Sequence, residues 1–486
     1  MSRRSRWRWS NREDQTLNEH IRIGTAELIG QRLADFTETL DGAAIPAAVR
    51  ARARHLILDA VGIALASTQY DFSHRTLAAL REFGAGDGDV IGYPAARLPL
   101  RDAVMMNGFL VHGLDYDDTH TAGVIHATAS CFPTALGMAA EVGASGTDLL
   151  TAYVAGMEVA TRLGAVAKGG FHQVGFHPTG LVGAFGCTLV AGKLRGMTAK
   201  QLAHAQGIVL SMASGSLEFL QDGAWTKRMH PGWAGVAGIT AAALARNGFL
   251  GPKAVYEGRF GLFPSHLGTY FDPANLALAT EGLEEVWEVE KVAVKPLPAC
   301  HFTHACADAA MALRAAHAIR PEQIAHVRAL VPAEVVKTVC EPVHHKKKPQ
   351  NSYDAQFSIP FAVASGLVHG RFGLAELEQD ALNDATTLAV AHKVDYEPDP
   401  NSAFPKYYSG EVIVTLADGR EVRHREHMNR GASDRPLTSA DIIAKFEENA
   451  SMALASAHVE RIKQAVLGLD EGISARELSR LLAGRA

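Results

Sequence analysis

A short stretch of this sequence gathers three histidines and three carboxylates within 15 residues: His112, Asp115, Asp117, Asp118, His120 and His126. Burial and crowding of like charges can move the pKa of such groups towards neutrality, which is what general acid–base chemistry needs. A capped helix end with solvated aspartates contains the same residue types. Both interpretations stay open on residue types alone.

Three further polar clusters interrupt otherwise apolar sequence, at residues 170–180, 225–232 and 295–304. In the first, Pro178 suits the start of a helix, whose free N–H groups would favour an anion beside His177. In the second, Lys227 and Arg228 make a possible carboxylate clamp. In the third, His301 precedes a helical run. A capping loop, a solvated basic loop and a buried structural histidine are the respective alternatives.

Common cofactor motifs do not occur. Gly84, Gly86 and Gly88 resemble a dinucleotide loop, but Asp89 stands where its third glycine belongs, so a turn is expected. The aspartates after position 114 resemble the start of a calcium loop, but the required glycine at its sixth position is missing. The sequence therefore signals no metal and no nucleotide cofactor.

Length and composition set broad limits. The 486 residues carry 47 basic and 52 acidic side chains, a formal net charge of −5, which argues against a nucleic-acid partner. No uncharged apolar run of about 18 residues is evident, so we expect no membrane span. The cysteines are odd in number and scattered without a C-x-x-C pair, which predicts reduced thiols and a cytoplasmic protein. The arginine-rich residues 1–21 are expected to form a disordered tail.

Helical periodicity dominates residues 22–291. Pro46 suits the first turn of a helix, and Thr147 and Thr198 are candidate N-caps for two more. Gln201, three residues after Thr198, completes a capping box. Because many of these helices are rich in alanine and glycine, a tightly packed bundle is expected.

The pattern changes near residue 292. Residues 292–294, 327–331 and 412–416 are typical of strands, and Asp418-Gly419 indicates a hairpin turn. After Pro436 the chain becomes helical again, with capping boxes beginning at Thr438 and Ser474. We therefore predict a mainly α protein in which residues 22–291 and 433–486 form one helical domain and residues 292–432 form an inserted α+β domain.

The four polar clusters, in this order, resemble the MmgE/PrpD family. The resemblance covers about residue 22 to the C-terminus and rests on four segments: L-D-Y-D-D-T-H at 114–120, F-H-P-T-G at 176–180, T-K-R-M-H at 226–230 and K-P-L-P-A-C-H at 295–301. Members include 2-methylcitrate dehydratases, cis-aconitate decarboxylases and iminodisuccinate epimerases. The resemblance implies a helical domain with an α+β lid, a homodimer, and a small carboxylic acid as substrate without metal or organic cofactor.

The resemblance also implies a pocket between the helical domain and the lid. At the matching positions it would contain Asp115, Thr119, His126, His177, Lys227 and His301. We assign carboxylate binding to Lys227 and His177 with help from Thr119, and acid–base catalysis to His126 and His301. Asp115 is expected to orient a neighbouring histidine and raise its basicity.

One position departs from the pattern of the decarboxylase-like members, which use an aromatic hydroxyl from the lid. Phe361 stands at the expected place, and Tyr353 is a loose substitute. Asp117 and the pair His126-Ala127 depart from the dehydratase pattern, and residues 124–129 look closer to the epimerase-like members. Three classes therefore stay open: a lyase acting on a small di- or tricarboxylate, an epimerase or isomerase acting on an amino- or imino-dicarboxylate, and a non-catalytic acid-binding protein.

Overall fold

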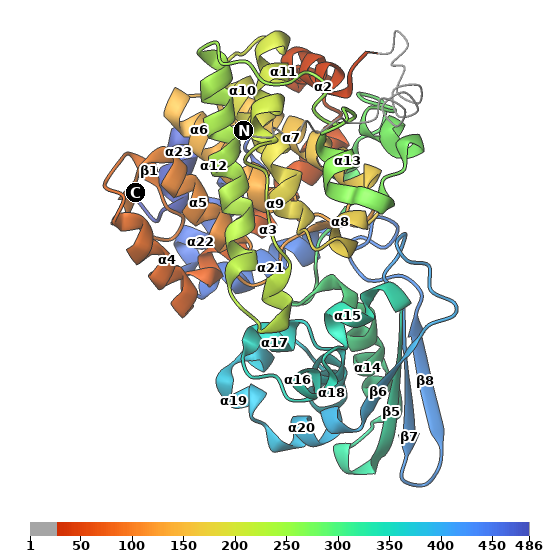
Figure 1. The fold of residues 1–486 in the computed structure, drawn as a ribbon. Helices are drawn as coiled ribbons and strands as arrows, with labels where there is room; N and C mark the ends of the chain where they lie inside the picture. The colour runs from red at the N-terminus through yellow and green to blue at the C-terminus, as the bar shows by residue number, and fades with distance from the viewer. Residues whose placement is uncertain (1–26, 486) are drawn as a thin grey trace, which may run out of the picture.

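The computed structural model describes residues 27–485, and the predicted tail at 1–21 lies outside them. The described chain forms a large helical domain and a smaller α+β lid joined along one side (Figure 1). The predicted mainly α fold with an inserted α+β domain is confirmed.

The helical domain is built largely from the first half of the chain. Its longest helices, α3, α7 and α12, each have 21 residues. The α-helices of this part are α2 (Ile29–Thr39), α3 (Ala47–Ser67), α4 (Asp71–Arg81), α5 (Leu100–Val111), α6 (Thr128–Val142), α7 (Gly146–Val166), α8 (Gly170–Gln173), α9 (Pro178–Leu181), α10 (Gly183–Leu194), α11 (Ala199–Val209), α12 (Thr226–Arg246) and α13 (Leu262–Leu267).

The predicted capping boxes form, whereas Pro46 is the N-cap of α3 and not a residue of its first turn. Thr198, Thr438 and Ser474 each close a capping box with the residue three positions later, as predicted. The predicted N-cap at Thr147 is wrong, because Ser145 caps α7 with the same kind of box. Gly146 adopts helical geometry, so the helix begins before Thr147.

Close approach of helices depends on glycine pairs. A Cβ atom placed on Gly108 of α5 would lie 2.7 Å from the Cα atom of Gly232 in α12. One placed on Gly186 of α10 would lie 2.7 Å from the carbonyl oxygen of Gly156 in α7. Any larger side chain at these positions would push the helices apart, which accounts for the glycine-rich helical sequence.

The lid packs helices on a four-stranded sheet. Its helices are α14 (His304–His317), α15 (Val336–Val339), α16 (Val343–Lys347), α17 (Ser352–Gln356), α18 (Ile359–His369), α19 (Gln379–Leu382) and α20 (Ala385–His392). The strand order is β6-β5-β7-β8, with bounds β5 Ile324–Val331, β6 Val394–Pro398, β7 Gly410–Leu416 and β8 Glu421–Glu426. β5 pairs with β6 in parallel and with β7 antiparallel, and β7 and β8 form the predicted hairpin.

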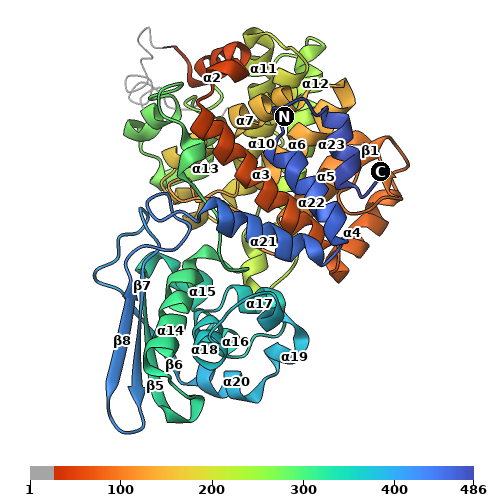
Figure 2. The same cartoon turned by 180° about the vertical axis from the view of Figure 1, so that it is seen from behind.

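The chain then returns to the helical domain. Helices α21 (Ser439–Ser451), α22 (Ser456–Leu467) and α23 (Ala475–Leu482) lie on that domain, with α21 and α22 beside α3 (Figure 2). Lys445 of α21 forms an ion pair with Asp59 of α3 at 2.7 Å. Both side chains are buried, so this contact joins the two ends of the chain inside one core.

Residues 292–293, which were predicted to begin the lid, still pair with the helical domain in the structure. The predicted strand there is β4 (Val292–Ala293), which pairs antiparallel with β3 (Thr119–His120) of the helical domain. The other two short strands, β1 (Gly88–Asp89) and β2 (Arg97–Leu98), form a hairpin at the surface. The apolar clusters of the lid include residues from Leu297 onward.

Within the described residues, α7 is long and apolar enough to cross a membrane by length and composition. Its most apolar window is 94% buried among the other helices. It also contains the ion pair between Glu158 and Arg162, which is fully enclosed by protein. Burial among the other helices makes α7 a core helix of the helical domain.

Candidate active site

Two loops from distant parts of the sequence meet through the β3–β4 pairing. Thr119 pairs with Ala293 in that ladder, which brings the loop after α5 against the segment that carries Lys295. Asp115 has φ +50°, a left-handed conformation that turns this loop back on itself. The ammonium of Lys445 then donates to the carbonyl oxygens of Tyr116 and Lys295, at 2.8 and 2.9 Å, and ties the two loops together.

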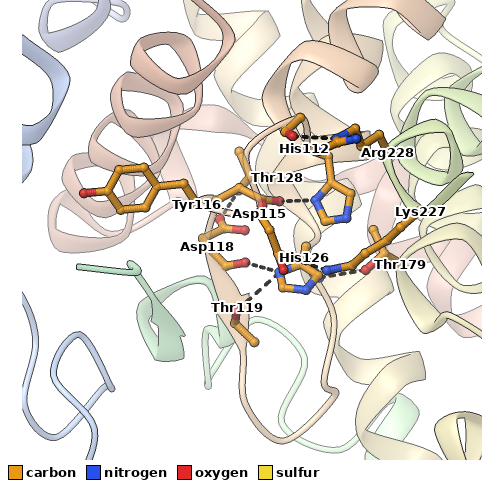
Figure 3. Close-up of polar contacts among 12 residues, drawn as sticks. His112, Asp115, Tyr116, Asp118, Thr119, His126, Thr128, Thr179, Lys227 and Arg228 are labelled. Carbon is orange, nitrogen blue, oxygen red and sulfur yellow. Dashed lines mark hydrogen bonds and ion pairs between the residues drawn. The ribbon is translucent and has the colours of Figure 1, made fainter. Parts of the chain in front are cut away.

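The Asp115 carboxylate lies between two lysines at the centre of the site. Its Oδ1 atom accepts from Lys227 Nζ at 2.7 Å (Figure 3). The same oxygen accepts from Lys295 Nζ at 2.8 Å. Burial alone would raise the pKa of Asp115, but the two ammonium groups lower it well below its usual range. Two ammonium groups therefore share one carboxylate oxygen, and the buried carboxylate of Asp117 also acts on Lys295.

His126 is held in one tautomer. Its Nδ1 lies 2.6 Å from the backbone carbonyl oxygen of Asp118, which can only accept, so Nδ1 carries the hydrogen (Figure 3). Nε2 is therefore the basic nitrogen of the neutral ring. Burial, reinforced by the charge of Lys295, lowers the pKa of His126 well below its usual value. A lowered pKa favours the neutral form of the ring.

His301 has the same tautomer as His126, but the opposite ring nitrogen is left without a partner. The backbone N–H of Tyr408 donates to Asn429 Oδ1 at 3.1 Å, which fixes the orientation of the amide. Asn429 Nδ2 must then donate to His301 Nε2, 2.8 Å away. The hydrogen of the neutral ring consequently sits on Nδ1, which is buried without a partner. Burial and Lys295 lower the pKa of His301 to about 3.

His177 forms the third member of the histidine group. Its Nδ1 lies 2.9 Å from Nδ1 of His230, so one of the two rings donates to the other, and its Nε2 is buried without a partner. Burial and the neighbouring His230 lower the pKa of His177 well below its usual value. His177 also occupies the N-cap position of α9, where Pro178 takes the first turn as predicted.

These side chains surround one cavity with about 460 Å³ of empty space. Both domains contribute to its wall, as the family resemblance implies. The polar residues that line it are Asp115, Thr119, His126, His172, His177, Lys227, Lys295, Cys300, His301, Thr338 and Tyr408. All six residues predicted from the sequence are among them.

Two sequence-based expectations need correction. Asp115 does not orient a histidine, because its hydrogen-bonded carboxylate oxygen contacts the two lysines. The aspartate that contacts a histidine is Asp117, which lies 2.8 Å from Nδ1 of His112. Arg228, suggested as part of the carboxylate clamp, does not line the cavity.

A lid tyrosine that sequence reasoning missed lines the cavity. Phe361 is buried in a separate apolar cluster of the lid, away from the cavity, because it faces Phe372 and its neighbours. Tyr353 is buried against Phe357 and does not line the cavity either. Tyr408 does line it, and its hydroxyl donates to the carbonyl oxygen of Thr121 at 3.2 Å.

Lys295 and Asn429 were also absent from the predicted site. Lys295 is the first residue of the K-P-L-P-A-C-H segment. Because the same segment led to the prediction of His301, it could also have indicated Lys295 as a site residue. Asn429 has no such signal, because it lies in a loop and acts through His301. Among residues 27–485, no group of three or more histidine, cysteine or acidic side chains is arranged to hold a metal ion.

A two-domain fold with a charged cavity between a helical body and an α+β lid defines the class of protein. Family models agree with it: the MmgE/PrpD N-terminal domain matches residues 31–273 and the MmgE/PrpD C-terminal domain matches residues 297–471. The chain belongs to the MmgE/PrpD family.

Curated relatives cover nearly the whole chain. It is 28% identical over 451 residues to a cis-aconitate decarboxylase of Mus musculus, covering 89% of each protein. It is 28% identical over 449 residues to the cis-aconitate decarboxylase of Homo sapiens, covering 89% of this chain and 90% of the relative. A cis-aconitate decarboxylase-like protein of Aspergillus oryzae is 27% identical over 476 residues, covering 93% of this chain and 96% of the relative.

Proposed function

We propose that this protein is a lyase of the decarboxylase or dehydratase type that acts on a small di- or tricarboxylate without a bound cofactor. The observation that carries the proposal is a pair of histidines in a cavity that also holds two lysines: His126 keeps a basic Nε2 and His301 keeps an unpartnered Nδ1–H. The relatives named as cis-aconitate decarboxylases support carbon dioxide loss as the first reaction to test.

Binding of the acid follows from charge. One carboxylate of the substrate would approach Lys227, with His177 and Thr119 beside it on the cavity wall. Ammonium groups attract carboxylates strongly where water is excluded, because the local dielectric constant is low. The same negative charge would raise the pKa of His126, whose Nε2 then takes up a proton from solvent.

The chemical step needs one proton and one charge-stabilising donor. As the carbon–carbon bond to the departing carboxylate breaks, carbon dioxide leaves and the bonding electron pair spreads into a conjugated carboxylate. His301 would stabilise this charge by donating its Nδ1–H, and His126 would deliver its Nε2 proton to carbon. One proton is consumed for each carbon dioxide released. In a dehydratase the same groups would instead remove a proton next to a carboxylate and protonate the leaving hydroxyl.

The test is mass spectrometry of purified protein with cis-aconitate, citrate, 2-methylcitrate and iminodisuccinate in deuterated buffer. A decarboxylase releases carbon dioxide from one acid and places one deuterium on the product carbon. A dehydratase releases water. Deuterium gain without any other mass change would instead establish the epimerase or isomerase class. No change in any acid would refute the proposed substrate class.

A variant pair makes the assignment of His126 specific. Replacing His126 with Gln should lower kcat by about 10²–10⁴, the usual contribution of a positioned proton-transfer group. His204 is the matched control, because its Nδ1 contacts the carbonyl oxygen of Gly251 at 3.0 Å in the same way but lies outside the cavity. His204→Gln should keep the activity of the unmodified protein.

A further inference from the structure

The adjacent cations Lys227 and Arg228 contact different cavities. Lys227 lines the catalytic cavity, whereas Arg228 lines a second one with about 530 Å³ of empty space at another point of the junction between helical domain and lid. Figure 3 shows the two side chains leaving α12 separately, Lys227 towards Asp115 and Arg228 towards the loop after α5. The second cavity has no part in the proposed reaction.

Arg228 is fixed in this position by a hydrogen bond and by aromatic rings, among them Trp225, whose ring centre lies 5.6 Å from the guanidinium carbon. Its Nε donates to the carbonyl oxygen of Gly113 at 2.7 Å. The guanidinium carbon lies 4.4 Å from the ring centre of Phe72 and 4.5 Å from that of Tyr353. Rings that stack on a guanidinium leave its edge available for hydrogen bonds in the plane.

The edge of this guanidinium has no acceptor. Among residues 27–485, no hydrogen bond or ion pair reaches either terminal nitrogen of Arg228, although the side chain is only 3% exposed and Nη1 is fully enclosed. Buried guanidinium donors are normally paired, and a carboxylate meets two of them at once. Asp71, an acid on the wall of this cavity, is 64% exposed at its side chain and pairs with Arg75 at 2.7 Å.

The remaining wall is aromatic and apolar. Tyr70 stacks on Phe72 with ring centres 6.0 Å apart, and Phe72 meets the edge of Trp225 at 6.4 Å. Trp225 is 42% exposed, which is unusual for so large an apolar side chain. Leu374 closes the cavity from the lid. A flat apolar group would fit between these side chains.

We propose that this cavity binds a small aromatic carboxylate. Its carboxylate would accept from the terminal nitrogens of Arg228, and its ring would pack between Trp225 and Leu374. Such a ligand would touch both domains, since Trp225 belongs to the helical domain and Leu374 to the lid. Because Arg228, which would hold the ligand, is the neighbour of Lys227 in the sequence, the bound ligand would restrain the lid close to the catalytic cavity.

The test is isothermal titration calorimetry with benzoate on the full chain. The unmodified protein should bind one equivalent with a millimolar or tighter dissociation constant, given the size of the ligand. Acetate, which lacks the ring, should bind at least about tenfold more weakly. Arg228→Gln should weaken benzoate at least about tenfold, since one partner of a buried charge pair is lost. Leu374→Trp should do the same by filling the cavity while leaving Arg228 intact.

The control separates this cavity from the catalytic one. Lys227→Met removes the cation of the catalytic cavity and should leave the affinity for benzoate within about twofold, since no carboxylate–lysine pair would be lost at the proposed site. Benzoate affinity that is lost in Lys227→Met but retained in Leu374→Trp would place benzoate in the catalytic cavity and overturn the proposal. Absence of benzoate binding to the unmodified protein would overturn it too. Neither outcome depends on the proposed reaction.

Discussion

Replacing Asn429 with Asp should reverse the tautomer of His301. In the native site, the amide of Asn429 donates to His301 Nε2 at 2.8 Å, while its oxygen accepts from the backbone N–H of Tyr408 at 3.1 Å. A carboxylate at 429 can still accept from Tyr408, but its second oxygen can only accept. The hydrogen of His301 must then move to Nε2, which leaves Nδ1 without the donor that the proposed reaction uses.

The size of the effect follows from the burial of His301. An adjacent carboxylate raises the pKa of a histidine by roughly 1–3 units, and the pKa of His301 begins at about 3. The ring therefore stays neutral at pH 7, and the changed tautomer is the main consequence. Loss of one positioned donor lowers kcat by about 10²–10³. The free energy of unfolding should change by less than about 1.5 kcal/mol, because the variant exchanges one hydrogen bond for another.

The measurement combines kcat on the acid identified by mass spectrometry with urea denaturation. Asn107→Asp is the matched control: Asn107 is buried, accepts from the backbone N–H of Ile91 at 2.9 Å and donates to the carbonyl oxygen of Asp89 at 3.1 Å. There the new carboxylate faces a carbonyl oxygen, so stability should fall by about 1–3 kcal/mol while kcat is retained. Full turnover by Asn429→Asp would refute the tautomer argument.

Three further predictions concern stability. Asp115→Asn leaves two buried lysines without their shared anion and should lower the free energy of unfolding by about 3–5 kcal/mol in urea denaturation. Asp87→Asn, whose native side chain is 95% exposed in its ion pair, should change it by less than about 0.5 kcal/mol; equal effects would contradict the argument from burial. Stability should also fall with acidification from pH 6.5 towards 3, because the unfolded chain takes up protons that buried histidines such as His301, with a pKa of about 3, do not accept in the folded state. The slope is up to about 1.4 kcal/mol per pH unit for each such histidine, and a flat profile across this range would be the contrary result. Tyr408→Phe removes the hydrogen bond from the lid to Thr121 and should cost about 0.5–1.5 kcal/mol, with an unchanged melting temperature as the opposing outcome.

The sequence predicted the site better than it predicted the contacts within it. Asp115, His126, His177 and Lys227 stood out because they form polar clusters in helical sequence that is otherwise apolar, and they do line one cavity. Which group Asp115 contacts depends on the β3–β4 pairing, which brings in Lys295 from 180 positions away. Local patterns do not encode such a contact.

Elements of the lid were harder to predict for similar reasons. Strand β6 has the sequence V-D-Y-E-P, with two acidic residues and a proline, and it forms only because it lies at the edge of the sheet beside β5. Tyr408 gave no signal, because it lies in a loop and reaches the cavity through docking of the lid on the helical domain. Phe361 was assigned to the place of the lid hydroxyl from its position in the sequence, but its side chain is buried in an apolar cluster of the lid.

The return of the C-terminal helices to α3 has a consequence for how the chain is made. Asp59 is buried with Lys445 as its partner, and Lys445 also contacts Tyr116 across 329 positions of sequence. During synthesis, α3 therefore exposes apolar surface and the Asp59 carboxylate until α21 has been synthesised and can pack against it. Long-range contacts of this kind slow folding and prolong the exposure of apolar surface that is prone to aggregation. Nascent chains that stop after the lid should thus be the species that chaperones retain.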